Sequence, residues 1–499
     1  TAVGIWHLQE RRQIRLFARK DAYGRYVSCL VYLPREKFNT QLINRMQTVL
    51  MNEFHGLEVN YDTFFPESVL ARIHYVIRTD PKKKHEFDPQ AVEQKLIEVG
   101  QSWHDNMRLR LIERYGEEEG IGLYRLYQHT FPAGYRETFK SNTAVYDVAY
   151  IEELRAGGDI AMSFYRPQSA EPGVLRFKLY RYDESIPLSD AIPMLENMGL
   201  RVMGEQPYEL KLDGRVVWLN DFLMYYREDT PMNVDDIKER FQIAFYKVWK
   251  GVAGNDSFNR LVLAAKLSWT EVRILRAYAK HLHQTGFPLS QHYIESAFTN
   301  NPDIARDVVS LFMARFDPTL AKNREKIVQE ILEKIQAALQ KVSSLDEDRI
   351  IHRYLDVIQA TLRTNYFQMD AAGHHKNYLS YKIDPKMVPE LPLPLPMFEA
   401  FVYSTRFEGV HLRGANVARG GIRWSDRRDD FRTEVLGLMK AQQVKNAVIV
   451  PYGAKGGFVP KRLPVDGSRE AIMQEGIACY QDYVRGLLDL VDNLENGNV

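Results

Sequence analysis

The chain reads Arg419-Gly-Gly-Ile-Arg-Trp424 and, after a helix-forming segment, Lys445-Asn-Ala-Val-Ile-Val-Pro-Tyr-Gly-Ala-Lys-Gly-Gly457. These stretches predict a glycine-broken strand over 418–424, an apolar strand over 447–450 and a tight turn that carries Lys455. Four cations surround the apolar strand: Arg419, Arg423, Lys445 and Lys455. Because two or three fixed cations suit a ligand with two carboxylates, the pattern predicts a site for a small dicarboxylate.

Lys455 is the candidate general base of this site. Neighbouring positive charge and burial both disfavour the ammonium form of a lysine, so a lysine in such a place can give up its proton. The alternative is a solvated turn, which is what a single Lys-Gly-Gly in a loop usually forms. The order of several cations and glycine pairs within about forty residues favours a site.

The segment between the two stretches predicts a helix from Asp430 to Lys445, with apolar positions Val435, Leu438, Met439 and Val444. Gln442 and Lys445 are three residues apart and therefore share one face near the helix C-terminus. This order of elements would carry Arg419, Gln442, Lys445 and Lys455 toward one end of a sheet.

The composition places the chain among folded multi-domain proteins. It has 499 residues, of which 45% are hydrophobic and 26% charged, and this length exceeds what one core supports. The 66 basic and 65 acidic side chains give a formal net charge of +1. We therefore expect no nucleic-acid partner and no membrane partner, because either favours a clear basic excess.

Two cysteines, Cys29 and Cys479, exclude a disulfide framework or a cysteine zinc site and favour a reducing, cytoplasmic location. No apolar run approaches the length of a membrane span. The chain begins Thr1-Ala-Val without an initiator methionine. We expect it to be an internal section of a longer polypeptide.

Two parts of the chain predict small open sheets with a helix on one face. The first has strands at 13–19, 26–33, 57–64 and 69–78 and a helix at 40–54. The second has strands at 174–182, 200–205, 208–212 and 215–225 and a helix at 188–198, with a hairpin turn at Asp213-Gly214. We interpret the second as a copy of the first in pattern, although not in sequence.

Residues 233–384 predict helices throughout, including an exposed helical hairpin around Ser343-Ser-Leu-Asp-Glu347. Five prolines then stiffen a linker, Pro385, Pro389, Pro392, Pro394 and Pro396, and we place the main boundary there. The predicted segments are 1–80, a mainly helical 84–170, 173–228, a helical 232–320, 321–386 with the hairpin and linker, and 387–499.

The segment from Val410-His-Leu-Arg-Gly through Ala418-Arg-Gly-Gly-Ile-Arg-Trp-Ser-Asp-Arg, continued by Lys445-Asn-Ala-Val-Ile-Val-Pro and Gly453-Ala-Lys-Gly-Gly-Phe458, resembles the very large NAD-specific glutamate dehydrogenases of bacteria. The resemblance implies a multi-domain α+β and α/β fold: ACT-like (ferredoxin-like) modules, helical motifs, then the substrate-binding half of an α/β dehydrogenase domain. It also implies NAD-dependent conversion of L-glutamate to 2-oxoglutarate and ammonia, and a homo-oligomer, with a tetramer favoured.

The resemblance also implies roles for individual residues. Lys455 matches the catalytic lysine, Lys445 the lysine that holds the substrate α-carboxylate, and Gln442 a neighbouring contact. Arg419, beside the substrate-binding Gly421, stands where smaller glutamate dehydrogenases carry a lysine that grips the side-chain carboxylate. A guanidinium can bind a carboxylate through two bonds, so this role is compatible with arginine.

No Gly-x-Gly-x-x-Gly follows a predicted strand, so we expect no NAD-binding residues in this chain and place the cofactor domain beyond Val499. We expect no metal site: Asp370 and His374 have helical ligand spacing, but Gly373 between them indicates a helix end. An alternative reading treats residues 1–386 as a non-catalytic scaffold for assembly and for sensing an amino-acid effector. Both readings can hold for one protein.

Overall fold

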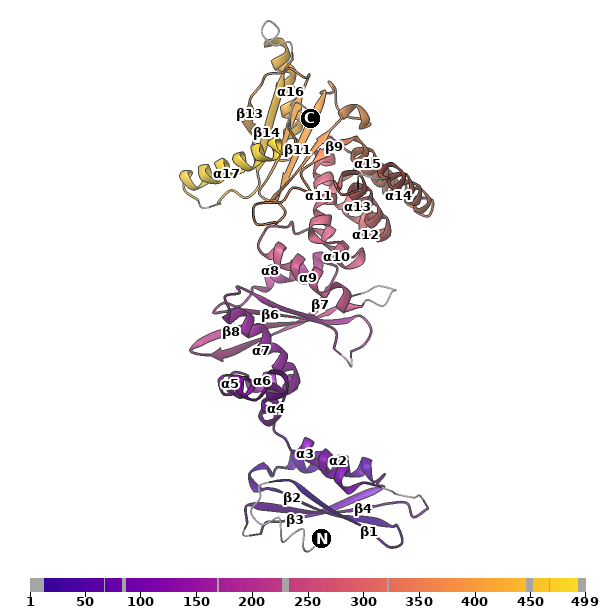
Figure 1. The fold of residues 1–499 in the computed structure, drawn as a ribbon, viewed down its shortest axis with the longest axis vertical. Coiled ribbons are helices and arrows are strands. Elements are labelled where there is room, and N and C mark those ends of the chain that lie inside the picture. The colour runs from indigo at the N-terminus through magenta and orange to yellow at the C-terminus, as the bar shows by residue number, and fades with distance from the viewer. Residues whose placement is uncertain are drawn as a thin grey trace. The chain divides into compact units, whose positions relative to one another are not determined.

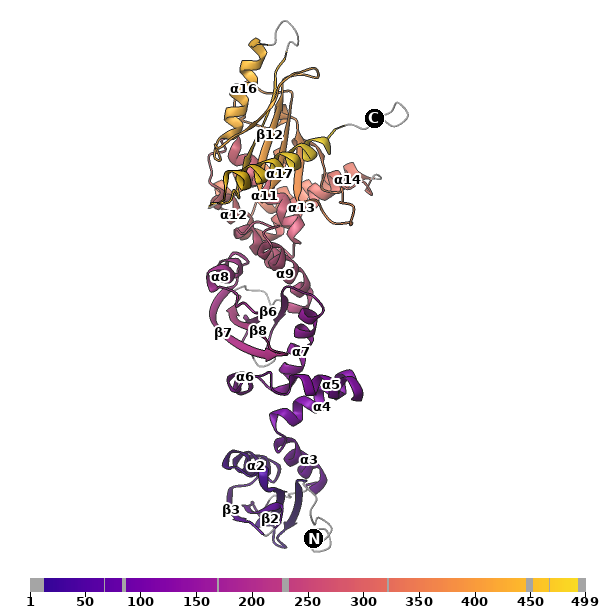
Figure 2. The same ribbon diagram turned by 90° about the vertical axis from the view of Figure 1, so that its left-hand side faces the viewer.

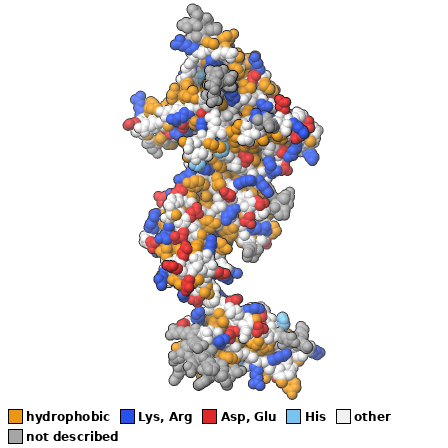
Figure 3. Space-filling view, in the orientation of Figure 1, with side chains coloured by type: hydrophobic (Ala, Val, Ile, Leu, Met, Phe, Trp, Pro, Cys, Tyr) orange, Lys and Arg blue, Asp and Glu red, His pale blue; other side chains and the backbone are white. Residues whose placement is uncertain are grey.

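The computed structural model describes residues 13–66, 68–82, 87–167, 170–226, 233–320, 323–445, 452–465 and 467–491. The chain divides into two compact units. Unit 1 comprises residues 1–158 and 208–217, and unit 2 comprises 159–207 and 218–499. Basic and acidic side chains are interspersed over the described surface on the face drawn in Figure 3.

Unit 1 begins with a four-stranded antiparallel sheet of order β1-β2-β4-β3, covered on one face by two helices (Figure 1). The elements are β1 (Arg15–Lys20), β2 (Tyr26–Pro34), α2 (Thr40–Glu53), β3 (Glu58–Phe64), β4 (Leu70–Arg78) and α3 (Pro89–Val99). Alternation of apolar residues along β2 and β4 turns one face toward the helices. The predicted strand-strand-helix-strand-strand order is confirmed.

Helix α3 belongs to this module, although the sequence grouped its residues with the helical segment 84–170. Its Val92 and Leu96 lie in the same core as Val27, Ile73 and Tyr75. Four helices follow: α4 (Trp103–Tyr115), α5 (Glu117–Tyr127), α6 (Ala133–Thr138) and α7 (Ser141–Arg155).

The second sheet, most of which belongs to unit 2, has the order β5-β6-β8-β7, which repeats that of the first. Its elements are β5 (Ala161–Tyr165), β6 (Val174–Tyr182), α8 (Leu188–Asn197), β7 (Arg201–Leu212), β8 (Arg215–Tyr225) and α9 (Val234–Trp249). The predicted copy is therefore confirmed. The sequence missed β5, and it was wrong in splitting β7 into two strands.

The helices of unit 2 share one large core with the second sheet and the C-terminal sheet. They are α10 (Leu261–Ala264), α11 (Trp269–Gln284), α12 (Gln291–Asn300), α13 (Pro302–Phe316), α14 (Arg324–Leu339) and α15 (Leu345–Ala360). The prediction of an exposed hairpin was wrong: α14 packs against α13, while α15 packs against α12 and α13. Helix α15 is largely buried because Ile351, Tyr354 and Ile358 point into the core.

The C-terminal sheet has six strands in the order β13-β14-β12-β11-β10-β9. They are β9 (Thr361–Thr364), β10 (Tyr378–Ile383), β11 (Phe398–Ser404), β12 (Phe407–Arg413), β13 (Ile422–Trp424) and β14 (Ala454–Pro460). Strands β13 and β14 run parallel, and the other neighbours are antiparallel. The helical prediction for 361–384 was wrong, and the boundary proposed at 386–387 falls between the paired strands β10 and β11.

Helices cover both faces of this sheet. Helix α17 (Arg469–Leu488) crosses one face, where Cys479 and Tyr483 pack on Val402 and Phe458 (Figure 2). Helices α11 and α16 (Phe431–Lys445) cover the other face. The candidate site lies where β13, β14 and α16 meet.

Candidate functional site at β13, β14 and α16

Backbone hydrogen bonds hold the segment before β13 against the beginning of β14. Arg419 N–H donates to the Tyr452 carbonyl at 3.2 Å, and Ala454 N–H donates to the Arg419 carbonyl at 3.0 Å. Gly456 N–H donates to the Gly421 carbonyl at 3.1 Å. These bonds bring Arg419 and Gly421 to the strand that carries Lys455; the sequence predicted this proximity for Arg419.

The two glycines before β13 meet different spatial demands. A Cβ on Gly420 would lie 1.3 Å from the Ala454 carbonyl oxygen, so only glycine allows this backbone approach. A Cβ on Gly421 would lie 4.0 Å from Lys455 Nζ. Gly421 therefore leaves open the space beside the lysine ammonium group.

Lys455 lies on a strand, and its prediction as part of a tight turn was wrong. It is the second residue of β14, paired across the sheet with Leu412 of β12. Side chains alternate along a strand, so Lys455 shares a face with Gly457 and Val459. A Cβ on Gly457 would lie 2.4 Å from Val435 Cγ2, which identifies this face as the one that packs on α16.

Helix α16 presents Val435, Met439 and Gln442 on one stripe at helical spacing. Val435 and Met439 are fully buried against the sheet, which places Gln442 on the sheet-facing side of the helix. Lys445 is the last residue of α16, and its side chain lies outside the described residues. The strand predicted over 447–450 also lies outside them.

The charges around Lys455 fall into two classes. Arg423 is committed to the protein: its Nε lies 2.7 Å from Glu434 Oε1, and Ser425 Oγ donates to the other oxygen of that carboxylate at 2.6 Å. In contrast, no acidic side chain in the described part of the chain pairs with Lys455 or with Arg419, which is exposed. Two cations are therefore available to an anionic ligand.

Sequence reasoning gave Glu434 no role. Its ion pair with Arg423 nevertheless makes that arginine unavailable to a ligand, unlike Arg419 and Lys455. The residues lie eleven apart on different elements, so helical or strand spacing alone could not pair them. Only the return of α16 over β13 brings the two side chains together.

No group of three metal-ligating side chains occurs within the described ranges. The Asp370 carboxylate accepts the backbone N–H groups of Ala372 and His374 at 2.9 and 2.8 Å in a turn between β9 and β10. Both bonds are accepted by Oδ1, which thereby closes the turn. Among the described helices, none combines the length and hydrophobicity that a bilayer crossing needs.

The turn from β13 into α16 does not fit a dinucleotide. A pyrophosphate needs a glycine-rich turn with free backbone N–H groups at a helix N-terminus. Here the turn carries Asp426, Asp429 and Asp430, and the Arg432 N–H already donates to Gln284 Oε1 at 3.2 Å. The turn contains no glycine, and its cations Arg427 and Arg428 already bond to Asp430 and to the Lys461 carbonyl, so it does not resemble a pyrophosphate-binding turn.

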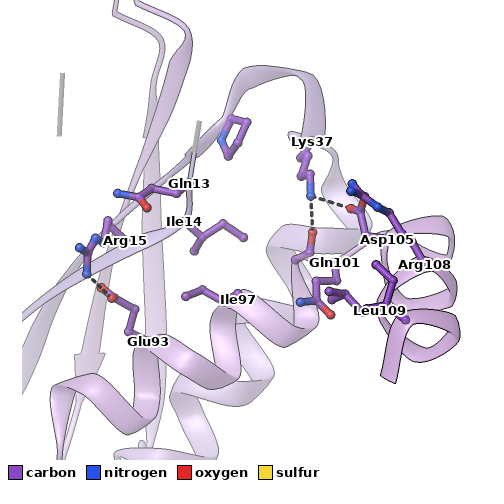
Figure 4. Close-up of a pocket in the computed structure, with 13 residues that line it drawn as sticks. Gln13, Ile14, Arg15, Lys37, Glu93, Ile97, Gln101, Asp105, Arg108 and Leu109 are labelled. Atoms are coloured by element: carbon purple, nitrogen blue, oxygen red, sulfur yellow. Dashed lines mark hydrogen bonds and ion pairs between the residues drawn. The ribbon is translucent and has the colours of Figure 1, made fainter. Parts of the chain in front are cut away.

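A second candidate site is an open pocket of about 650 Å³ in unit 1, between β1, α3 and α4 (Figure 4). Its floor is apolar and is formed by Ile14, Ile97 and Leu109. Ion pairs stand at its two ends: Arg15 NH1 lies 2.6 Å from Glu93 Oε1, and Lys37 Nζ lies 2.9 Å from Asp105 Oδ2.

Arg108 of α4 also lines this pocket, and it has no acidic partner among the residues the structure describes. The pocket thus combines an apolar floor with one uncompensated guanidinium. Such a combination suits a small carboxylate that carries an apolar portion.

Family models of glutamate dehydrogenases match five successive parts of the chain. The model described as the catalytic domain of bacterial NAD-glutamate dehydrogenase matches residues 334–499. Models of the glutamate dehydrogenase ACT2 and ACT3 domains match 15–104 and 159–237. Models of its helical motifs 2 and 3 match 110–154 and 253–318.

Curated relatives named NAD-specific glutamate dehydrogenase align along the whole chain. The protein of Halomonas elongata is 48% identical over 100% of this chain and 31% of its own length. The Pseudomonas aeruginosa protein gives the same identity and shares. The Mycobacterium tuberculosis protein is 38% identical over 99% of this chain and 32% of its own length. The chain thus spans about a third of these relatives.

Proposed function

Because the chain is a section of a large bacterial NAD-specific glutamate dehydrogenase, we propose that the site at β13, β14 and α16 binds L-glutamate for oxidation to 2-oxoglutarate and ammonia. The observation that carries the proposal is the Lys455 ammonium group beside the side-chain-free Gly421, with no acidic partner in the described part of the chain. A lysine that lies on a strand and is kept apart from carboxylates is available to substrate.

Three side chains bind the substrate in this proposal. Arg419 holds the side-chain carboxylate, and Lys445 holds the α-carboxylate, with Gln442 as a neighbouring contact. A cation for each carboxylate fixes both ends of a five-carbon dicarboxylate. The reacting Cα then lies near Lys455, because Gly421 leaves that space open.

Lys455 handles a proton in this proposal. Oxidation of glutamate at Cα produces 2-iminoglutarate, and a water molecule must then attack the imine carbon. Lys455 Nζ takes a proton from that water as the C–O bond forms, and then returns it to the substrate nitrogen of the resulting carbinolamine. Ammonia leaves as the C–N bond breaks, and the hydroxyl group gives up its proton to Lys455 to become the carbonyl of 2-oxoglutarate.

NAD accepts the hydride in the proposed reaction, but no described residue is assigned to it. We propose that the dinucleotide site lies in a part of the full-length protein outside this section. We further propose a cytoplasmic homo-oligomer, with a tetramer favoured. Light scattering of the full-length protein measures the subunit number.

The decisive experiment measures NADH production from L-glutamate by the full-length protein and its Lys455→Ala variant. We expect turnover in the first and a loss of about a thousand-fold or more in the second, with NAD affinity retained. Lys386→Ala removes an exposed lysine far along the chain from the site and is the matched control. Near-normal activity of Lys455→Ala would refute the assignment.

A second function, sensing of an amino-acid effector, is favoured by the pocket of unit 1. We propose that the carboxylate of the effector pairs with Arg108 while its apolar part covers Ile97. Calorimetric titration with a panel of amino acids tests this proposal, and we expect Arg108→Ala to lose binding. Arg110→Ala is the matched control, because Arg110 is exposed on the same helix and already pairs with Glu113. Equal binding by the two variants would remove the pocket from consideration.

A further inference from the structure

Helix α11 ends at the beginning of α16, and Gln284, its last residue, holds that beginning through both ends of its side-chain amide. Gln284 Oε1 accepts the backbone N–H of Arg432 at 3.2 Å, and Nε2 donates to the Arg428 carbonyl at 2.8 Å. The Gln284 side chain is buried. A buried amide with both ends bonded has one orientation, because any other would leave polar groups unsatisfied.

A buried ionic cluster ties α16 to the sheet and to α11. Arg432 donates to both oxygens of Glu399 on β11, at 2.8 and 2.6 Å, and His281 of α11 contacts Glu399 Oε1 through Nε2 at 3.0 Å. Arg432 and His281 are 0% exposed and Glu399 is 1% exposed. Burial alone would raise the pKa of Glu399, but the charge and hydrogen bonds of Arg432 and the contact with His281 hold it well below its usual range.

Such a cluster fixes geometry more than it adds stability. Removing two charges from water costs several kcal/mol per ion, which their attraction repays only with good geometry. The doubly bonded Arg432–Glu399 pair allows little rotation of α16 relative to β11. Helix α16 therefore leaves this point in a defined direction.

The direction of α16 decides where its far end lies. Arg432 and Gln442 are ten residues apart, or about 15 Å along a helix. A tilt of about 10° at the base would move Gln442 by roughly 2.5 Å, which is enough to misplace a substrate contact. Between Arg432 and Gln442, the side chain of Val435 packs on Gly457, which lies two residues after Lys455 on β14.

We propose that α11, within the part of the chain matched by helical motif 3, positions the substrate-binding end of α16 through Gln284 and His281. Both are positioning residues, since they act through Arg428, Arg432 and Glu399. This inference rests on the proposed function, which places Gln442 and Lys445 in the glutamate site.

The test compares Gln284→Met with His283→Ala in the full-length protein. Methionine has nearly the length of glutamine but cannot make either hydrogen bond, while His283 is an exposed neighbour on the same helix. We expect Gln284→Met to raise the KM for glutamate about ten-fold and to leave the KM for NAD unchanged. His283→Ala should match the wild type in its KM for glutamate and in its KM for NAD.

A purely structural role for Gln284 predicts a different result, namely a lower melting temperature with an unchanged KM for glutamate. That result overturns the inference. If Gln284→Met does not fold, Gln284→Asn keeps the amide but shortens its reach. A glutamate KM of Gln284→Asn within two-fold of wild type would equally overturn it.

Hydrogen exchange separates failure of this inference from failure of the proposed function. Faster exchange along α16 in Gln284→Met, measured without substrate, supports positioning even if the wild-type protein does not oxidise glutamate. If the wild type oxidises glutamate, and Gln284→Met shows unchanged exchange along α16 and an unchanged KM for glutamate, the positioning inference is refuted while the proposed function stands.

Discussion

At the residue scale, Gly420 and Gly421 are adjacent but have separable roles. Gly420→Ala places a Cβ against the Ala454 carbonyl and must displace β13 from β14, so we expect destabilisation by several kcal/mol and loss of the site. Gly421→Ala meets nothing closer than Lys455 Nζ at 4.0 Å. It should fold normally and raise the KM for glutamate several-fold.

Thermal denaturation and steady-state kinetics of the two variants check this prediction. Equal melting temperatures for both would contradict the close approach at Gly420. An unchanged KM in Gly421→Ala would place the substrate away from Lys455.

His411 gives the sheet a pH dependence. It lies on β12 opposite Gly456, and burial, with the nearby positive charge of Arg413, lowers its pKa from 6.5 to about 4. The unfolded chain then binds a proton more readily, so stability present above pH 6.5 is lost as the pH falls toward 4. The loss is at most about 3 kcal/mol.

Urea denaturation between pH 7 and 4.5 measures this effect. His411→Gln, which stays neutral, should show a shallower decline than the wild type. Parallel curves for the two proteins would mean that His411 does not titrate as described.

Sequence reasoning placed Arg419 and Lys455 toward the same end of a sheet, because the order of cations and glycine pairs along the chain is a local signal. It could not find the ion pair of Arg423 with Glu434, since that pairing depends on how α16 folds back over β13. It also took the glycines around Lys455 as evidence of a turn. Here they serve packing instead: side chains on Gly456 and Gly457 would collide with Tyr483 and Val435.

At the scale of elements, α16 and β14 approach closely because Gly457 has no side chain. Gly457→Ala would place its Cβ 2.4 Å from Val435 Cγ2, so we expect a loss of about 1–3 kcal/mol from overpacking. Val435→Ala removes the colliding methyl groups. The double variant should therefore be more stable than the sum of the two single changes predicts.

A double-mutant cycle of unfolding free energies measures this coupling. Additive effects would show that the helix and strand do not meet at this pair. Tyr483→Phe, which alters the opposite face of the sheet, is a control and should be additive with Val435→Ala.

Periodicity predicted most helices correctly, because long amphipathic stripes are strong signals. It failed at β9 and β10, which are short and follow directly on the helical run that ends with α15. The partners of β10 are β9 and β11, and β11 lies beyond a proline-rich connection. Strand pairing across such a gap cannot be detected from the local spacing of apolar residues.

At the scale of the whole chain, the two copies of the sheet module differ in which elements contribute to their hydrophobic cores. The first has a core of its own, formed by residues of its sheet with α2 and α3. The second shares its core with α10, α11 and the C-terminal sheet. Gly251, which follows α9, accepts hydrogen bonds from Thr405 Oγ1 and Arg462 NH1, both at 2.8 Å.

We therefore expect residues 1–101 to fold alone and residues 159–250 not to. Circular dichroism should show cooperative melting for the first fragment and a broad transition or aggregation for the second. Sharp melting of both fragments would show that the shared core is dispensable to the second module.

The parallel pair β13 and β14, in an otherwise antiparallel sheet, bears on the order of folding. Two parallel neighbours need a crossover, and α16 is that crossover, so strand, helix and strand together span only residues 422–460. Ile422 and its partner Gly456 lie 34 residues apart (456 minus 422), whereas Tyr381 of β10 and its partner Thr364 of β9 lie 17 apart (381 minus 364). Because the entropic cost of closing a loop grows with its length, the antiparallel neighbours are expected to pair first. The strand that carries Lys455 thus acquires its neighbours Arg419 and Gly421 late, after β9 to β12 have formed the rest of the sheet.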